Sequence, residues 1–348
     1  MKRYLTLLLS LLLLTGCSAQ ETPGPTASAS TAEGGTEKNS VTVFAMDTVM
    51  DISAYGASDA LLQSAEERVK QLESLLSVTD ENSEIYQLDH TGQADLSPDT
   101  AELLGDALEL CGRTGGALDI SIYPVLREWG FTTGEYQIPS QETLKELLRE
   151  VDYRRVELDG AAAALPEGME VDLGSVAKGY TGDQLCALLK EGGVTSGMLN
   201  LGGNVQVIGS KPDGSAWRVA VQDPEGDDYL GVLELRDKAA ITSGGYERYF
   251  VGDDGQTYWH IIDPATGAPA RSGLTSVTIV GDRGVVCDAL STALFVMGLE
   301  RASDFWRQSG DFEAVLVADD GSVYITKGLE DCFSLTEENA QRTLTVIS

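Results

Sequence analysis

The sequence predicts an α+β fold in which helices pack on a mainly antiparallel sheet. Strand and helix patterns alternate from Val41 onward. Hairpin signals gather in the C-terminal half, where short strands of period two follow one another. No repeat of about 20 to 50 residues is evident, which argues against solenoids and propellers. A chain of 348 residues is long enough for one large domain or for two intimately packed subdomains.

The N-terminus has the pattern of a targeting segment. Lys2 and Arg3 precede an apolar run, Tyr4–Leu14, which is too short to span a bilayer but typical of a signal-peptide core. The run ends in Leu-Thr-Gly-Cys at 14–17, which resembles the bacterial lipobox, whose cysteine is acylated and becomes the mature N-terminus. We therefore expect residues 1–16 to be a lipoprotein signal peptide and Cys17 to anchor the chain at the extracytoplasmic face of the cell membrane. The alternative is an ordinary secreted protein with a chance cysteine.

A flexible tether is expected after the anchor. Residues 18–40 contain no aromatic and no branched aliphatic side chain, so they cannot bury enough apolar surface to fold. A flexible coil of this length reaches about 25 to 30 Å on average. The sequence thus divides into a signal peptide, a lipidated cysteine with its tether at 17–40, and a folded domain at 41–348.

Four helices and a final long one follow from patterns of period 3.6 and from capping residues. Apolar side chains share one face from Ser58 to Ser77. Serine supplies the N-cap of the next two helices, and a proline stands in the first turn of one of them. The expected helices are 58–77, 97–112, 140–150, 174–190 and 284–308.

Strands are predicted where apolar and polar residues alternate with a period of two. A closing hairpin is expected to turn at Asp-Asp-Gly, residues 319–321. The expected strands are 41–55, 198–208, 217–222, 230–235 and 275–280, with the hairpin at 312–326.

Charge and composition exclude several classes of function. The chain carries 24 Lys and Arg against 55 Asp and Glu, a net charge of −31, so its surface repels nucleic acid. Only two histidines are present, His90 and His260, which excludes a multi-histidine zinc site. Four cysteines follow Cys17, and we expect buried free thiols, with one disulfide as the alternative. They are Cys111, Cys186, Cys287 and Cys332.

One candidate anion site lies at 171–180. Asp172 stands at the expected end of a strand, and small residues then begin a helix, whose N-terminal N–H groups favour an anion. Taken alone, Asp172 is better explained as an N-cap and Lys178 as a solvated surface residue.

A second candidate is the pair Asp288 and Thr292. Their spacing places a carboxylate and a hydroxyl on one face of an otherwise apolar helix. A buried acid needs a partner, and two hard oxygen ligands with an incomplete shell suit Mg²⁺. The alternative is a helix N-terminal acid beside a core threonine.

Further glycine-bounded segments lie where strands turn. His260 opens His-Ile-Ile-Asp-Pro-Ala-Thr-Gly, which is ordinary turn chemistry, and a structural histidine is the commoner outcome at such a position. Residues 200–204 and 242–250 offer hydroxyls, glycine N–H groups and an arginine that suit a phosphate. The G-x-G-x-x-G, Walker A and G-x-S-x-G signatures are absent from the sequence.

Taken together, these segments resemble those of the ApbE-type FAD:protein FMN transferase (flavin transferase) family over nearly the whole folded length. The matching segments are Met46–Thr48, Gly116–Ile120 with Pro124 and Trp129–Phe131, Asp172–Tyr180, Asn200–Gly203, Thr242–Phe250, His260–Gly267 and Asp288–Gly298. The resemblance implies a T-fold-like α+β architecture. It also implies transfer of FMN from FAD to a threonine or serine of an extracytoplasmic or membrane redox protein, with release of AMP.

The resemblance also assigns residues. It implies that Mg²⁺ is bound by the side chains of Asp288 and Thr292 and by the backbone carbonyl of Ser175, and that His260 and Asp288 act at the reacting phosphate. The residues that it places around FAD are Met46, Ala117, Leu118, Asp119, Asp172, Lys178 and Ile262. Asp47 departs from the family pattern, which commonly has glycine there, and its carboxylate is expected to repel an anionic ligand.

Two other classes of function stay open. A lipid-anchored, acidic protein on a tether also matches a solute-binding lipoprotein, which needs no metal and consumes no FAD. A Mg²⁺-dependent FAD pyrophosphatase would use the same pocket with water as the acceptor. AMP release separates the binding protein from the enzymes, and a protein acceptor separates the two enzymes.

Overall fold

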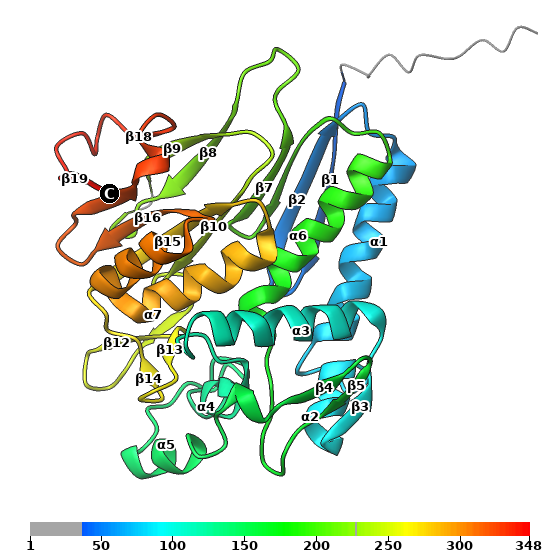
Figure 1. Cartoon of the computed structure of the whole chain (residues 1–348), viewed down its shortest axis with the longest axis vertical. Helices are drawn as coiled ribbons and strands as arrows, with labels where there is room; N and C mark the ends of the chain where they lie inside the picture. Colours follow the sequence, from blue (N-terminus) through cyan, green and yellow to red (C-terminus); the bar gives the residue numbers. More distant parts are fainter. Residues whose placement is uncertain (1–36, 227) are drawn as a thin grey trace, which may run out of the picture. The chain divides into compact units, whose positions relative to one another are not determined.

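A nine-stranded sheet forms the centre of the residues that the computed structural model describes, 37–226 and 228–348 (Figure 1). All neighbouring strands are antiparallel except the last pair, which is parallel. The expected α+β fold with a mainly antiparallel sheet is therefore confirmed. In spatial order the strands are β1 (Lys38–Ala45), β2 (Thr48–Tyr55), β6 (Ser196–Leu201), β7 (Asn204–Gly209), β10 (Ala239–Gly244), β15 (Leu274–Gly281), β16 (Glu313–Ala318), β17 (Val323–Thr326) and β19 (Leu344–Ile347).

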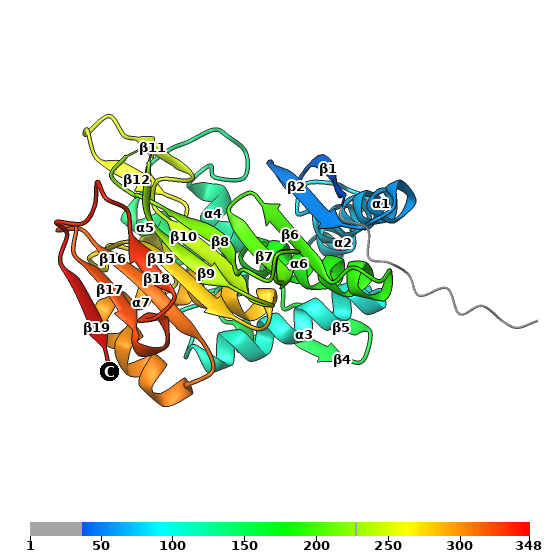
Figure 2. The same cartoon turned by 90° about the horizontal axis from the view of Figure 1, so that it is seen from above.

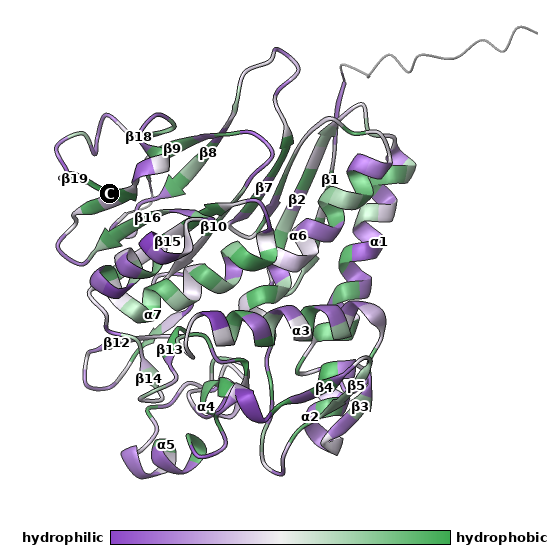
Figure 3. Ribbon diagram, in the orientation of Figure 1, coloured by the Kyte–Doolittle hydropathy of each residue, from purple (hydrophilic) through white to green (hydrophobic). Residues whose placement is uncertain are grey.

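Helices cover one face of this sheet. α1 (Asp59–Leu76) packs on β1, α6 (Gly174–Glu191) on β7, and α7 (Gly284–Ser309) on β10 and β15. α3 (Pro98–Arg113) contacts both α6 and α7 (Figure 1). Their apolar stripes are fully buried, and Figure 3 shows hydrophilic and hydrophobic stripes side by side on α1 and α3. Burial of these stripes is the main force that holds the helices to the sheet.

A smaller sheet covers the other face of the C-terminal strands. It consists of β8 (Trp217–Gln222), β9 (Tyr229–Leu235) and β18 (Phe333–Leu335), with β9 in the middle. Buried and exposed residues alternate strictly along β8, as they must in a strand with one face on a core. Its buried residues join one apolar cluster with residues of β16 and β17.

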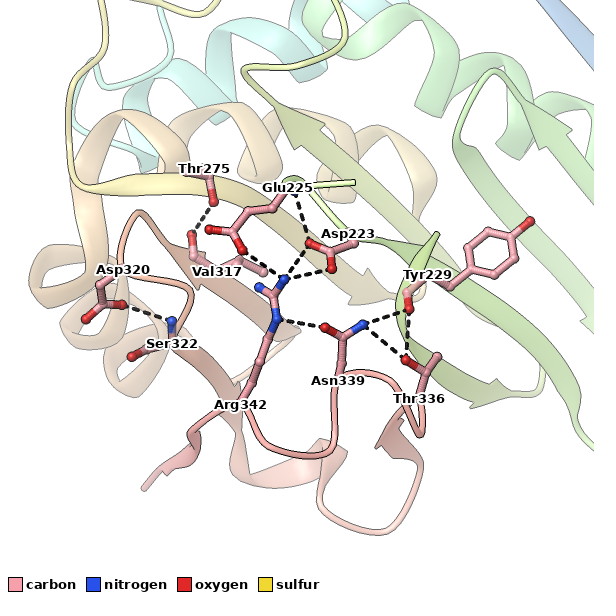
Figure 4. Close-up of polar contacts among 10 residues, drawn as sticks. All are labelled: Asp223, Glu225, Tyr229, Thr275, Val317, Asp320, Ser322, Thr336, Asn339 and Arg342. Atoms are coloured by element: carbon pink, nitrogen blue, oxygen red, sulfur yellow. Dashed lines mark hydrogen bonds and ion pairs between the residues drawn. The ribbon is translucent and has the colours of Figure 1, made fainter. Parts of the chain in front are cut away.

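A largely buried ion pair holds the chain near the C-terminus to this smaller sheet (Figure 4). One guanidinium nitrogen of Arg342 donates to both carboxylate oxygens of Asp223, at 2.9 and 2.7 Å. The same nitrogen reaches Glu225, and Nε of Arg342 donates to Asn339 at 2.8 Å. Asn339 in turn donates to the carbonyl of Tyr229 in β9. Because these charges are paired and hydrogen-bonded, their burial is tolerated.

Most of the remaining elements lie at one end of the large sheet (Figure 1). They include two short hairpins and a three-stranded sheet in which β5 lies between β3 and β4. The helices are α2 (Glu84–Thr91), α4 (Tyr123–Glu128) and α5 (Gln141–Leu147), with 3-10 turns at Ile120–Ile122, Tyr153–Arg155 and Lys327–Leu329. The strands are β3 (Gln93–Asp95), β4 (Glu157–Asp159), β5 (Ala162–Ala164), β11 (Tyr249–Val251), β12 (Thr257–Trp259), β13 (Ile262–Asp263) and β14 (Ala268–Pro269).

Most predicted elements are confirmed, and four are corrected. The expected strand 41–55 is a hairpin, because Met46 and Asp47 form a two-residue turn with positive φ angles of 49° and 58°. The expected strand 198–208 is likewise two strands, with a turn at Gly202-Gly203. The helix at 140–150 ends at Leu147, and residues 165–172 contain no strand, so Asp172 does not end one. β10 was not predicted, although it lies inside the sheet.

The predicted signal peptide, Cys17 and most of the tether lie outside the described residues. The last three residues of the predicted tether, 38–40, belong instead to β1. The four cysteines within the described residues are free thiols, and Cys111 and Cys287 are buried. Among the described helices, none combines the length and the apolar character needed to cross a membrane.

Candidate active site

The site begins where α6 and α7 cross at two glycines. A Cβ atom on Gly179 would lie 2.3 Å from the carbonyl oxygen of Gly284 and 2.7 Å from the Cβ of Asp288. Only glycine allows this approach, because a methyl group needs more room than either distance provides. Gln206 from β7 donates to the carbonyl of Gly179 at 3.0 Å. The crossing therefore brings Asp288 against the first two turns of α6.

Asp288 carries a nearly buried carboxylate, and only one of its two oxygens accepts a hydrogen bond from the described residues. It is 5% exposed, and its Oδ2 accepts the N–H of Gly179 at 2.8 Å. Burial raises the pKa of Asp288, whereas Lys178 and this N–H group lower it. The buried Asn204 amide lowers the pKa as well, from a position that falls short of hydrogen-bond geometry. A carboxylate in this position favours a bound cation.

Hydroxyl groups lie on the same stretch of α7. Thr292 stands one turn after Asp288, and Oγ of Ser243 in β10 lies 3.2 Å from its Oγ1. The same Ser243 hydroxyl is 2.8 Å from the hydroxyl of Ser291. Ser175 is half-buried in the first turn of α6. The groups available to a cation are oxygens, as hard divalent ions require.

The donor set agrees with Mg²⁺ rather than with zinc. Among residues 37–226 and 228–348 there is no group of three or more His, Cys, Asp or Glu side chains able to hold a metal. One carboxylate, one hydroxyl and a backbone carbonyl leave coordination positions for water and phosphate. That is the sphere that Mg²⁺ prefers.

Lys178 lies at the electrostatic centre of the site. The half-buried ammonium is close enough to lower the pKa values of Asp172, Glu247, Asp288 and His260. The pKa of Glu247 is raised to about 7, first by desolvation and then by Asp288. Arg248 opposes this shift. Sequence reasoning named the segment that contains Glu247 but not the residue, because nothing in the local pattern places it near Asp288.

His260 follows β12 and faces this cluster with a defined tautomer. Its backbone N–H donates to the carbonyl of Arg248 at 3.1 Å, and its ring Nδ1 lies 3.3 Å from the same oxygen. A carbonyl only accepts, so Nδ1 carries the proton and Nε2 keeps its lone pair. Burial, helped by the charges of Arg248 and Lys178, lowers the pKa of His260 to about 4. The ring is therefore neutral at physiological pH.

The turn between β1 and β2 approaches the same region. The backbone N–H of Met46 donates to Glu73 at 2.6 Å. Oδ2 of Asp47 lies 3.6 Å from a guanidinium nitrogen of Arg248, and both side chains are exposed to solvent. The carboxylate that departs from the family pattern thus faces a cation. Asp47 also has a left-handed backbone conformation, which is less favourable in free energy for aspartate than for glycine.

Asp172 joins the start of α6 to the segment at 117–122. Its Oδ1 accepts the N–H of Gly174 at 2.8 Å, and its own N–H donates to the carbonyl of Ile120. The side chain of Asp119 is held entirely by protein groups: Oδ1 accepts the N–H and the hydroxyl of Ser121, and Oδ2 accepts the N–H of Tyr153. Asp119 therefore joins its own loop to the 3-10 turn at Tyr153–Arg155.

Three of the apolar residues assigned by the resemblance lie in the core, whereas Met46 in the turn between β1 and β2 is partly buried. Ala117 and Leu118 belong to the largest apolar cluster, and Ile262 packs with Trp129 and Phe131 in a smaller one. The polar side chains of the predicted site include Lys178, Asp288, His260 and Thr292, whose hydroxyl contacts Ser243. A cavity of about 400 Å³ beside α6, lined by residues such as Asp183 and Lys190, contains none of the predicted site residues. The predicted site residues therefore do not line this cavity.

Comparisons with known proteins agree with this geometry. The sequence profile of the ApbE family matches residues 46–316, and that of the prokaryotic membrane lipoprotein lipid attachment site matches residues 1–18. The FAD:protein FMN transferase of Treponema pallidum is 32% identical over 284 residues, which cover 76% of this chain and 78% of that protein.

Solved structures give the same result. The ApbE protein of Thermotoga maritima is 30% identical and matches with a TM-score of 0.79, over 84% of this chain and 98% of that one. The flavin transferase ApbE from Vibrio cholerae is 25% identical and matches with a TM-score of 0.77, over 85% of this chain and 99% of that one. From its sequence, its fold and the arrangement of its site, the chain belongs to the ApbE family.

Proposed function

We propose that this protein transfers FMN from FAD to a threonine or serine hydroxyl of an extracytoplasmic redox protein and releases AMP, in a reaction that depends on Mg²⁺. The names of its relatives support a flavin transferase. The observation that carries the proposal is a neutral His260, with Nε2 free, in the same charge cluster as Lys178 and the buried Asp288.

The cluster supplies the positive charge that a pyrophosphate needs. A protein of net charge −31 repels FAD at long range, so local cations must reverse the potential. Lys178, Arg248 and the N–H groups at the start of α6 can do so. Met46, Ala117, Leu118, Asp119, Asp172 and Ile262 are proposed to complete the FAD site. The buried ones among them would shape its wall, and Asp119 would act through its loop.

Asp288 and Thr292 would hold Mg²⁺ by their side chains, and Ser175 by its backbone carbonyl. The metal supplies charge stabilisation for phosphoryl oxygens when it is bound. Asp288 is held for this task by the N–H of Gly179, which leaves its other oxygen free of hydrogen bonds among the described residues. Thr292 is positioned by the contact of its hydroxyl with Ser243.

The bond changes balance with one proton transfer. The acceptor oxygen forms a bond to the FMN phosphorus, and the bond from that phosphorus to the oxygen of AMP breaks. The hydroxyl proton passes to Nε2 of His260, which is unprotonated at physiological pH. Arg248 keeps the ring in this tautomer through its carbonyl oxygen. The neighbouring Glu247 gives the site a second group that titrates near neutrality, with a pKa of about 7.

We also propose where the reaction takes place. Cleavage before Cys17 and acylation of this cysteine would anchor the mature chain at the extracytoplasmic face of the membrane, and the match at residues 1–18 supports a lipid anchor. Two acyl chains hold a protein stably at a membrane, whereas one binds only marginally. The tether would then let the folded domain reach acceptors near the surface.

The test uses the full chain in detergent with FAD, with Mg²⁺ or EDTA, and with or without a flavin-free acceptor domain. AMP that appears only with Mg²⁺, together with an FMN adduct on the acceptor, is the expected result. AMP without an adduct would indicate a pyrophosphatase that uses water. FAD that stays intact in every arm would indicate a binding protein and contradict both enzymatic functions.

A further inference from the structure

We propose that the acceptor protein binds as an added β-strand along the free edge of β11, which leads it to His260. This inference rests on the proposed transfer to a protein hydroxyl. Three independent features of the hairpin β11–β12 carry it: the direction of its free backbone groups, its exposed apolar side chains and its connection to the catalytic histidine.

The pairing pattern shows which backbone groups of β11 are free. In an antiparallel ladder, facing residues alternate between hydrogen-bonded and non-bonded pairs. The N–H of His260 donates to Arg248, and the N–H of Gly252 donates to Gln256, so these two facing pairs are bonded. Tyr249 and Val251 therefore direct their N–H and C=O groups away from β12. No hydrogen bond to either N–H group is found within the described part of the chain. Such an edge is a template for another strand.

Exposed apolar side chains gather at the same place. Tyr249 is 49% exposed and Val251 is 62% exposed, and they lie on one face of β11. Tyr136 and Ile138 in the neighbouring loop are 47% and 45% exposed, but they lie against Phe250 and Gly252 on the opposite face of β11. Tyr249 and Val251 are two of the nine large apolar side chains that are exposed among the described residues, and both belong to this three-residue strand. Exposed apolar side chains beside free backbone groups mark an interaction surface.

Aromatic rings connect this surface to the site. The ring of His260 lies 6.4 Å from that of Phe131, edge to face. Phe131 is 5.8 Å from Phe250 in β11, and Phe250 stacks on Tyr136 at 5.0 Å. The hairpin is thus packed rigidly against the residue that would take the acceptor proton, at the edge of the fold (Figure 2). A strand paired with Tyr249 would lie beside Arg248, the preceding residue in the chain, whose carbonyl contacts His260.

The occupant that suits this edge is an extended segment of the acceptor that carries its threonine or serine next to apolar residues. Backbone hydrogen bonds would supply affinity that does not depend on the acceptor's sequence, and the exposed apolar side chains of β11 would supply selectivity. A water molecule needs no docking surface, so this edge would serve transfer to a protein and would have no role in hydrolysis.

The test is the variant Val251→Pro, because proline removes the outward N–H but no bond to β12. Val251→Ala is the matched control, since it shortens the side chain and keeps the N–H. The probe is the flavin-free domain of a redox protein that carries FMN on a threonine. We expect KM for this domain to rise about tenfold in Val251→Pro and much less in Val251→Ala, with FAD binding and the melting temperature unchanged.

Equal KM values for wild type and Val251→Pro would overturn the inference, and so would equal increases in both variants. Absence of any adduct with the wild-type protein would instead contradict the proposed function. A measurement without mutation is amide hydrogen exchange of the wild type. Slower exchange at residues 249–251 on adding the domain is expected, and unchanged exchange there while adduct forms would also overturn the inference.

Discussion

The backbone N–H of Gly179 donates a hydrogen bond of 2.8 Å to the carboxylate of Asp288, and the absent side chain of Gly179 makes the bond possible. One contact thereby fixes both the distance between α6 and α7 and the orientation of the acid. The groups assigned to the metal come from these two helices. The proposed metal site therefore depends on the helix crossing.

Replacing Gly179 with alanine should damage the site and the fold together. The new Cβ would meet backbone at 2.3 Å, which forces the helices apart and costs about 1 to 3 kcal/mol of the free energy of unfolding. Denaturant unfolding and Mg²⁺-dependent AMP release measure the two effects. Gly105→Ala in α3 is the control, because its Cβ would lie 3.6 Å from Leu158 and alanine favours a helix by up to about 1 kcal/mol. Equal stability of the two variants would refute the crossing as the cause.

Asp288→Asn keeps the shape of the side chain but removes its charge. We expect loss of Mg²⁺-dependent AMP release by at least about a hundredfold, as for the loss of a major stabilising group. Asp282→Asn is the matched control, since Asp282 lies near the same helix end but is exposed and pairs with Lys238. Calorimetric titration with Mg²⁺ and FAD checks binding directly. Full activity of Asp288→Asn would remove it from the metal site.

His260→Ala should separate binding from chemistry. The neutral ring is placed to take a proton, so its loss should lower the rate of transfer by about 10² to 10⁴ while FAD still binds. His90→Ala is the control, because His90 is exposed in α2 and lies outside the charge cluster around Lys178. Flavin fluorescence measures FAD binding, and intact mass of the acceptor measures transfer. Unchanged turnover in His260→Ala would move the base to another residue.

A pH prediction follows from Asp89, which supports the segment before Asp172. Its Oδ1 accepts the N–H of Val171 at 2.8 Å, and burial raises its pKa to about 8. The folded state thus keeps a proton that the unfolded state releases near pH 4. The contribution of Asp89 to stability is complete below about pH 4 and is lost as the pH rises towards 8.

Asp89→Asn does not titrate, so its melting temperature should rise relative to wild type between pH 4 and pH 8 and then stay level. Thermal unfolding of both proteins across this range checks the sign. A difference that is independent of pH would show that Asp89 is ionised in the folded protein at all these values.

Much of the fold could be predicted because, in long segments, the spacing of apolar residues shows both the type of element and the face that is buried. The helices that hold Lys178 and Asp288 begin where the sequence indicates, and the spacing of Asp288 and Thr292 already places them on one face. The turn at Met46 and Asp47 could not be predicted, because a turn with two positive φ angles normally contains asparagine or glycine. An alternating strand pattern that continues through such a turn hides it.

The site was predictable in its separate segments but not in their connections. Glu247 approaches Asp288, and Arg248 orients His260, only because β10, β11 and β12 bring distant segments together. These contacts depend on tertiary packing, about which local periodicity carries no information. The resemblance places Asp119 at the FAD site, and its carboxylate accepts hydrogen bonds from Ser121 and from the backbone N–H of Tyr153, a distant contact that local periodicity could not predict.

The most direct test of the account is peptide mapping of the acceptor after reaction with wild-type protein, FAD and Mg²⁺. The account predicts FMN on a single threonine or serine, with one AMP released for each adduct, and no adduct with His260→Ala. AMP released from FAD at the same rate while the acceptor stays unmodified would contradict it, because the FMN phosphoryl group would then have been transferred to water.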